Sequence, residues 1–301
     1  MLSIPEESEC SSEYVFLNYT QDELDDAYNQ LRYAREAASV GDLYNSLSIR
    51  TRSSNNFSSH SYGASADETL DYFHSETADS NPIFIFIHGG EWRLGTKEMY
   101  SFLAPAFLDA GIDFVSLDFS LIPSVRIPEM SSQIHEAVRW IYNHSRELGG
   151  NPDQIVIGGH SSGAHLAAVL AVSDWTGYSV PQDVVKGALC LSGVYDLYPV
   201  ILSYRKGFVS LSTEEVLSYS PIRHISPERK GGFIVSHGTR ETPEFQRQSA
   251  AFAAMLGAGA RDLVVMEDRD HFEVLLELAN SQSVLFQKVI SLVTDIKTRY
   301  Q

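Results

Sequence analysis

The apolar positions along the chain follow two alternating patterns from about residue 68 onward. Short, nearly continuous apolar runs alternate with longer segments in which apolar residues recur every three or four positions. The run at 83–88 is continuously apolar up to its final histidine, which is typical of a central parallel strand buried on both faces. Similar runs predict further strands at 68–74, 114–119, 155–158, 184–191, 232–236 and 263–266.

Helices are predicted between these strands. Segments with helical spacing lie at 99–110, 130–148, from 162 onward, 272–279 and 282–298. Alternating strands and helices imply an α/β fold, in which a mostly parallel sheet is covered by helices on both faces. The sequence has no internal repeat and no shift in composition, so we predict a single domain overall.

The amino-terminal region has a different pattern. After a polar tail, Thr20 and Glu23 have the spacing of a helix capping box, and apolar residues continue at helical intervals to Ala34. Residues 51–66 are rich in Ser and Asn and are predicted to be a loop. We therefore divide the chain into two parts. Residues 1–60 form an extension, which is either a packing helix or a partial lid, and residues 61–301 form the α/β unit. The stretch 195–229 has no clear strand and is expected above the edge of the sheet.

Composition excludes several classes of partner. The chain has 301 residues and a formal net charge of −17, which argues against nucleic acid or an anionic membrane as a partner. The two cysteines, Cys10 and Cys190, do not suggest a disulfide framework, and no Cys/His spacing resembles a metal site. The first residues lack the basic and apolar regions of a signal peptide, and no apolar run is as long as a membrane span. We expect a cytoplasmic protein without metal or cofactor.

A candidate nucleophile lies after the strand at 155–158. The sequence Gly159-His160-Ser161-Ser162-Gly163 is a G-x-S-x-G pattern with a predicted strand before it and a helix after it. A tight turn between strand and helix would push the Ser161 hydroxyl out of the sheet, and small flanking residues let the backbone crowd together. The same turn presents the Ser162 N–H at a helix start, where developing negative charge is stabilised.

A candidate oxyanion hole follows the buried strand at 83–88. His88 is followed by Gly89, Gly90, Glu91 and Trp92. The two glycines let the backbone turn its N–H groups toward a substrate oxygen, and together with the N–H of Ser162 they would form an oxyanion hole.

The hydroxyl of Ser161 needs a histidine to accept its proton. Among the ten histidines, His271 follows the last predicted strand, in a loop ahead of a helix, which suits the chain order serine, acid, base. His237 also ends a strand but lies close to the expected acid. The remaining histidines singled out lie on helices, in the irregular region or beside the oxyanion and nucleophile turns: His88, His135, His144, His160, His165 and His224.

Several carboxylates compete to orient His271. Glu241 lies where an acid would follow the strand at 232–236. The other candidates are Asp196, Asp268 and Glu244. Asp270 neighbours His271 in the chain, so its side chain is expected to point elsewhere.

The chain resembles the α/β-hydrolase superfamily from about residue 62 onward, in the branch of kynurenine formamidases (arylformamidases) and hormone-sensitive-lipase-like esterases. The stretches that carry the resemblance are His88-Gly-Gly-x-Trp92, Gly159-His-Ser-x-Gly-Ala-His-Leu166, Leu191-Ser-Gly-Val-Tyr-Asp-Leu197, Pro243-Glu-Phe-x-Arg-Gln-Ser249 and Asp270-His-Phe272. The resemblance implies Ser161 as nucleophile, His271 as base and Gly89, Gly90 and Ser162 as the oxyanion hole. The family's acid is an aspartate at the position of Glu241, so the arm here is one methylene longer.

Another departure concerns the substrate. Formamidases often have Tyr where this chain has Glu91. Glu91 would place a carboxylate near the reacting carbonyl, where it could bind a substrate amine or an attacking water, or face solvent. Trp92 and Tyr195 are further candidates for substrate binding, although aromatic residues are more often core.

These observations predict a cofactor-independent serine hydrolase with a small-molecule substrate; a homodimer is left open. The resemblance implies cleavage of a small N-acyl bond such as that of N-formylkynurenine or a related formamide. The alternatives are a short-chain carboxylesterase and, from another class, a non-catalytic ligand receptor built on the same fold.

Overall fold

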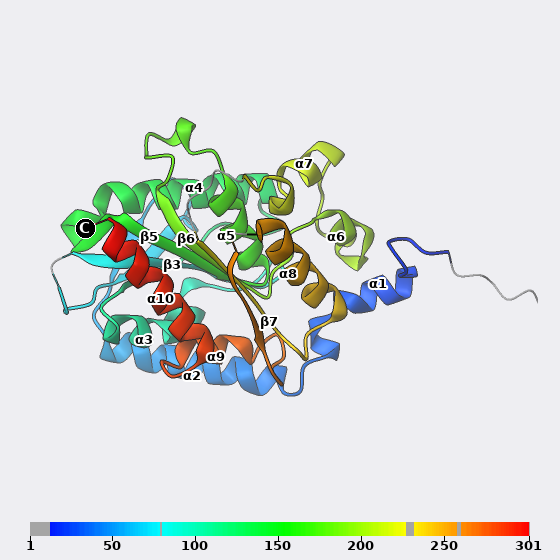
Figure 1. Ribbon diagram of the computed structural model, residues 1–301, viewed down its shortest axis with the longest axis horizontal. Helices are drawn as coiled ribbons and strands as arrows, with labels where there is room; N and C mark the ends of the chain where they lie inside the picture. Colours follow the sequence, from blue (N-terminus) through cyan, green and yellow to red (C-terminus); the bar gives the residue numbers. More distant parts are fainter. Residues whose placement is uncertain (1–12, 79, 227–231, 258–259, 301) are drawn as a thin grey trace, which may run out of the picture.

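The computed structural model describes residues 13–78, 80–226, 232–257 and 260–300. Cys10 and the first residues considered for a signal peptide lie outside this part of the chain. The described strands form one sheet in the order β1-β2-β4-β3-β5-β6-β7-β8 (Figure 1). The strands are β1 (Ser58–Ser61), β2 (Thr69–Phe73), β3 (Asn81–Ile87), β4 (Asp113–Leu117), β5 (Gly150–His160), β6 (Val185–Leu191), β7 (Gly232–Gly238) and β8 (Ala260–Met266).

The sheet is parallel except at one edge. β1 and β2 pair antiparallel, as do β2 and β4, and every pair from β4 through β3 to β8 is parallel. The helices are α1 (Gln21–Ala27), α2 (Ala37–Ser54), α3 (Ala104–Asp109), α4 (Ile127–His144), α5 (Ser162–Val172), α6 (Tyr198–Leu202), α7 (Thr213–Ser218), α8 (Pro243–Leu256), α9 (Val274–Ala279) and α10 (Val284–Arg299). The mostly parallel α/β architecture predicted from the sequence is confirmed.

Two hydrophobic cores lie on opposite faces of the sheet. In β3, Ile83, Ile85 and Ile87 pack with α4, α5 and α8, whereas Phe84 and Phe86 pack with α2, α3, α9 and α10. All seven residues of β3 are buried, and every residue after Asn81 is apolar. Because successive side chains of a strand point to opposite faces, a strand between two cores favours apolar residues at consecutive positions.

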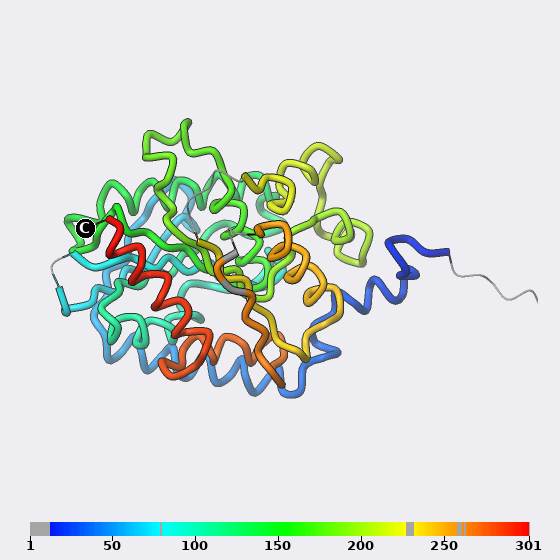
Figure 2. Tube along the Cα trace, in the orientation of Figure 1, coloured from blue at the N-terminus to red at the C-terminus, as the bar shows by residue number. Residues whose placement is uncertain are grey.

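The amino-terminal segment passes from one face of the sheet to the other. Leu24 and Tyr28, in and after α1, belong to the core of α4 and α5, whereas Val40 and Tyr44 of α2 belong to the opposite core. The connection between α1 and α2 runs beside the segment that joins β7 to α8 (Figure 2). The segment therefore crosses the edge of the sheet at which the parallel strands end.

The capping box predicted at Thr20 is present, with the Thr20 hydroxyl accepting from the Glu23 N–H. The helix it starts ends at Ala27, earlier than the apolar spacing suggested, and a 3₁₀ turn follows at Gln30–Arg32. The loop expected at 51–66 holds the last turn of α2 and the strand β1. The proposed boundary at residue 60 thus falls inside β1.

Helices α2 and α8 were not identified from the sequence. The buried positions of α2 include Ser48 and Thr51, and those of α8 include Gln248 and Ser249. Polar residues on the buried face interrupt the apolar period on which helix prediction depends. Among the described residues, no helix combines the length and the apolar character needed to span a bilayer.

Two glycines allow β5, α5 and β3 to meet closely. A methyl group at Gly159 would lie 2.2 Å from the Gly163 carbonyl oxygen, and one at Gly163 would lie 2.1 Å from that of Ile87. These neighbours are backbone atoms, which cannot move without shifting a strand or a helix. The start of α5 therefore depends on glycine at both positions.

We expect Gly163→Ala to lower the free energy of unfolding by about 1–3 kcal/mol, because the added methyl group overpacks the α5–β3 contact. Gly41→Ala is the matched control: it lies inside α2 and its methyl group would meet nothing within 4 Å. This control should be neutral or stabilising by about 0.5–1 kcal/mol. Urea unfolding of both variants checks the prediction, and equal stabilities would contradict it.

Candidate active site

Ser161 lies at the turn between β5 and α5, at the carboxyl edge of the sheet. Its backbone has φ 57° and ψ −123°, a strained conformation typical of a nucleophile on a sharp strand-to-helix turn. The Ser161 N–H donates to the Leu191 carbonyl at 2.9 Å, which ties the turn to the end of β6. The turn thereby holds the hydroxyl in one position above the sheet.

His271 lies in the loop between β8 and α9, and its Nε2 is 2.9 Å from the Ser161 Oγ. The neighbouring Asp270 points away from the imidazole, and its Oδ1 accepts the N–H groups of Phe272 and Glu273. That carboxylate shapes the loop that carries the histidine.

Glu241 lies in the turn after β7, and its Oε2 is 2.9 Å from His271 Nδ1. Its other oxygen, Oε1, accepts the Ser192 hydroxyl at 2.6 Å and the Gly238 N–H at 2.7 Å. The residue is 2% exposed, so its charge is balanced by hydrogen bonds rather than by water. The side chain folds back onto its own turn, and the arrangement accommodates the longer glutamate arm.

The other carboxylates considered from the sequence have different partners. Asp196 pairs with Arg223, Asp268 with Arg35, and Glu244 with Arg247. His237, the other strand-end histidine, contacts the Gly238 carbonyl through Nδ1. The structure therefore brings Ser161, His271 and Glu241 together and leaves the competing carboxylates outside this group.

Two residues that support this group were not singled out for that role from the sequence. Gln30, in the segment between α1 and α2, lies 3.5 Å from Glu241 Oε2 through its Nε2, and its Oε1 accepts the Thr242 N–H at 3.2 Å. Ser192 directly follows β6, with φ 55°. Nothing in the local sequence marks Gln30, because its partners are more than 200 positions away along the chain.

His160 packs against the imidazole of His271, with the ring centroids 4.5 Å apart. Its Nε2 donates to the His271 carbonyl at 2.8 Å. Burial, and then the neighbouring His271, hold the pKa of His160 well below its usual value. A neutral His160 adds no positive charge beside an imidazolium at His271.

The loop after β3 approaches the nucleophile closely. A methyl group at Gly89 would lie 3.0 Å from the Ser161 Cβ and 2.8 Å from the His160 carbonyl oxygen, so only glycine fits there. The Ser162 hydroxyl accepts the Trp92 N–H at 3.1 Å and fastens the loop to the start of α5. Gly89, Gly90 and Ser162 thus lie around the nucleophile, and their role as an oxyanion hole stays a prediction.

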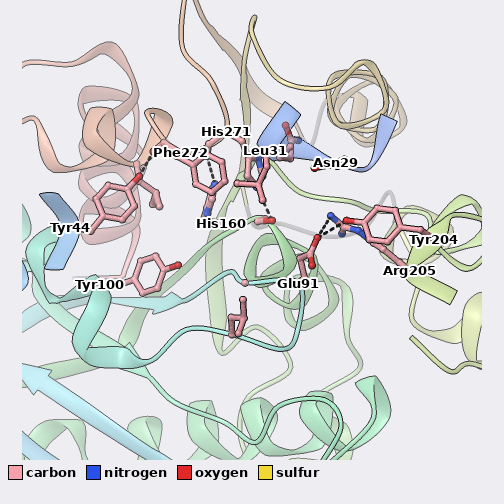
Figure 3. Close-up of a pocket in the computed structure, with 15 residues that line it drawn as sticks. Asn29, Leu31, Tyr44, Glu91, Tyr100, His160, Tyr204, Arg205, His271 and Phe272 are labelled. Carbon is pink, nitrogen blue, oxygen red and sulfur yellow. Dashed lines mark hydrogen bonds and ion pairs between the residues drawn. The ribbon is translucent and has the colours of Figure 1, made fainter. Parts of the chain in front are cut away.

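Ser161 and His271 line a cavity of about 420 Å³. Tyr44 and Tyr100 lie on one side of His271, and Glu91, Tyr204 and Arg205 lie on the other (Figure 3). The lining consists of Asn29, Gln30, Leu31, Tyr44, Gly90, Glu91, Leu94, Tyr100, His160, Ser161, Tyr204, Arg205, His271, Phe272 and Leu275. The amino-terminal segment and the stretch after β6 therefore build walls of the cavity over the strand ends.

Glu91 lies in this lining, but the two aromatic candidates for substrate binding do not. Trp92 is 1% exposed, and its indole N–H donates to His165 Nδ1. Tyr195 is fully buried and stacks on Phe252. The expectation that Trp92 and Tyr195 contact a substrate is corrected by this placement, because both rings fill the core. In the described parts of the chain, no group of three or more His, Cys, Asp or Glu side chains could hold a metal.

Comparison with known proteins gives relatives with hydrolytic activities. The family model described as BD-FAE matches residues 70–200. Kynurenine formamidase from Danio rerio is 30% identical over 241 residues, which cover 77% of this chain and 80% of the relative. Isoprenylcysteine alpha-carbonyl methylesterase from Arabidopsis thaliana is 26% identical over 258 residues, which cover 77% of this chain and 60% of the relative.

Solved structures agree with the fold. A putative thioesterase from Silicibacter sp. TM1040 has a TM-score of 0.78 and 27% identity, over 90% of this chain and 99% of the other. A thermophilic carboxylesterase from a metagenomic library, at 16% identity and a TM-score of 0.67 over 92% of this chain and 99% of the other, shares the fold. The chain is a serine hydrolase, and it belongs to the kynurenine formamidase family of the α/β-hydrolase superfamily.

Proposed function

We propose that this protein hydrolyses a small N-acyl bond, with N-formylkynurenine or a similar aryl formamide as substrate, through an acyl-enzyme on Ser161. The observation that carries the proposal is the continuous hydrogen-bonded line from Ser161 through His271 to the buried Glu241, at the wall of a cavity. The similarity to formamidases supports the choice of substrate.

In the first half of the reaction, the Ser161 Oγ attacks the substrate carbonyl carbon while His271 Nε2 takes the hydroxyl proton. Glu241 holds the Nδ1 proton of the imidazole and stabilises the imidazolium that forms. The oxyanion is held by backbone N–H groups of Gly89, Gly90 and Ser162. The C–N bond then breaks, and His271 gives its proton to the departing amine.

In the second half, water attacks the acyl-enzyme with His271 as the base. Its proton moves to Nε2 and then to the Ser161 Oγ as the acid product leaves. His160 stays neutral. The positive charge that forms during the reaction therefore lies on the His271 ring, whose Nδ1 faces Glu241. The chemistry requires only these side chains and water.

A short-chain carboxylesterase is the second candidate function. The cavity also has apolar lining residues that suit an acyl or alkyl group, among them Leu31, Leu94, Tyr100 and Leu275. Several relatives are esterases, and the same serine, histidine and acid serve esters and activated amides alike. The third alternative, a non-catalytic receptor, is disfavoured by the intact hydrogen-bonded line.

Ser161→Ala should abolish turnover of both N-formylkynurenine and p-nitrophenyl acetate, by at least about 10,000-fold in kcat, because no nucleophile remains. Initial-rate kinetics with purified protein measure the loss, and thermal unfolding checks that the variant is folded. Turnover close to that of the wild type would exclude the acyl-enzyme on Ser161.

Glu241→Gln should lower kcat by about 1,000-fold or more, because an amide cannot stabilise the imidazolium of His271. Asp196→Asn and Asp268→Asn are matched controls that remove a carboxylate charge from a surface ion pair, and we expect rates within roughly two-fold of the wild type. If either control loses as much activity as Glu241→Gln, the acid has been assigned to the wrong residue.

The two enzyme functions differ in their substrate preference. The formamidase proposal predicts a kcat/KM for N-formylkynurenine at least about 10-fold above that for p-nitrophenyl acetate, although the ester has the better leaving group. Parallel kinetics on the same preparation decide the question. A strong preference for the acetate would favour the carboxylesterase.

A further inference from the structure

One side of the active-site cavity contains an ion pair that the proposed mechanism does not use. Glu91 Oε1 accepts from Arg205 Nη2 at 3.0 Å and from the Tyr204 hydroxyl at 2.9 Å. Figure 3 shows this group on the opposite side of His271 from Tyr44 and Tyr100. Glu91 is also the residue that replaces the tyrosine often found in formamidases, so its carboxylate is a feature of this chain.

Arg205 is held in place by contacts within the protein. Its side chain is 2% exposed, and Nη2 also donates to the Tyr28 carbonyl at 3.0 Å. The guanidinium lies 5.2 Å from the centre of the Tyr28 ring and 5.6 Å from that of Phe245. We therefore assign Arg205 an anchoring role.

Glu91 is the open member of the pair. Its side chain is 34% exposed, and the bonds from Arg205 and Tyr204 both end on Oε1. The backbone of Glu91 has φ 56°, directly after Gly90 of the loop around the nucleophile. Arg205 and Tyr204 thus hold one oxygen of a carboxylate that lines the cavity.

The charges that line a neighbouring hollow favour a cation. A second hollow shares Asn29 and Tyr204 with the active-site cavity. Its charged lining residues are Asp22, Asp25, Asp26 and Arg32. Together the two hollows are lined by four carboxylates and two guanidinium groups, and the whole chain has a net charge of −17. An excess of one sign along an approach raises the local concentration of the opposite charge.

We propose that Glu91 binds a positively charged amino group of the substrate, so that the preferred substrates are acyl compounds whose leaving group carries an ammonium. The ammonium would donate to Glu91 Oε2 while the carbonyl lies at Ser161. This inference rests on the proposed function for the position of the carbonyl, and it names the chemical group that the site selects.

Binding measurements test the cation site without relying on turnover. The probes are kynuramine, an aminophenyl ketone whose side chain ends in an ammonium, and aminobutyrophenone, in which a methyl group takes its place. Isothermal titration calorimetry at neutral pH should give a dissociation constant for kynuramine about 10-fold lower than for aminobutyrophenone, as expected for one charge-assisted hydrogen bond. In Glu91→Gln, the two constants should become nearly equal.

Glu147→Gln is the matched control, because it removes the same charge from an exposed residue near the start of β5, at the opposite end of the strand from Ser161. This variant should keep the roughly 10-fold preference. Equal binding of both probes by the wild type, no detectable binding of either, a preference that survives in Glu91→Gln, or an equal loss in Glu147→Gln would each overturn the inference. A clear preference for kynuramine in a protein that cleaves no formamide would support the cation site and overturn the proposed substrate instead.

Discussion

The active-site edge of this molecule depends on one buried carboxylate. Glu241 is held by the end of β6 through Ser192, by its own turn after β7, by the loop that carries His271, and by the amino-terminal segment through Gln30. A carboxylate removed from water is tolerated only when hydrogen bonds compensate for its lost hydration. The donors around Glu241 supply that compensation and, in doing so, join four segments that are distant in the sequence.

The same interaction couples the fold to the chemistry. Parallel strands end at a common edge, so the turns after β3, β5, β7 and β8 bring the glycine loop, Ser161, Glu241 and His271 to one place. Close backbone contacts at Gly89 and Gly163 leave little room for the loop and the helix to shift. The hydrogen-bonded line is therefore held by the packing of rigid elements as well as by its own bonds.

Two segments that lie outside the alternating strands and helices contribute walls to the cavity. The segment between α1 and α2 and the stretch from α6 to the following 3₁₀ turn at Tyr204–Gly207 close it over the strand ends. These parts supply Leu31, Tyr204 and Arg205 to its walls. The catalytic residues are common to hydrolysis of esters and amides, so selectivity must come from these walls.

Strong local signals in the sequence were enough to locate several elements. The continuous apolar run of β3 and the G-x-S-x-G turn at Ser161 follow from short stretches of chain, because strand burial and tight turns restrict residue types locally. The choice of Glu241 over Asp196, Asp268 and Glu244 as the partner of His271 needed the folded structure. Helices α2 and α8 bury polar residues, which interrupt the helical spacing of apolar positions. Trp92 and Tyr195 are core residues. The contacts of Gln30 with Glu241 and of Arg205 with Glu91 join positions more than 100 residues apart. Such pairs are selected by packing in three dimensions, and no local pattern records them.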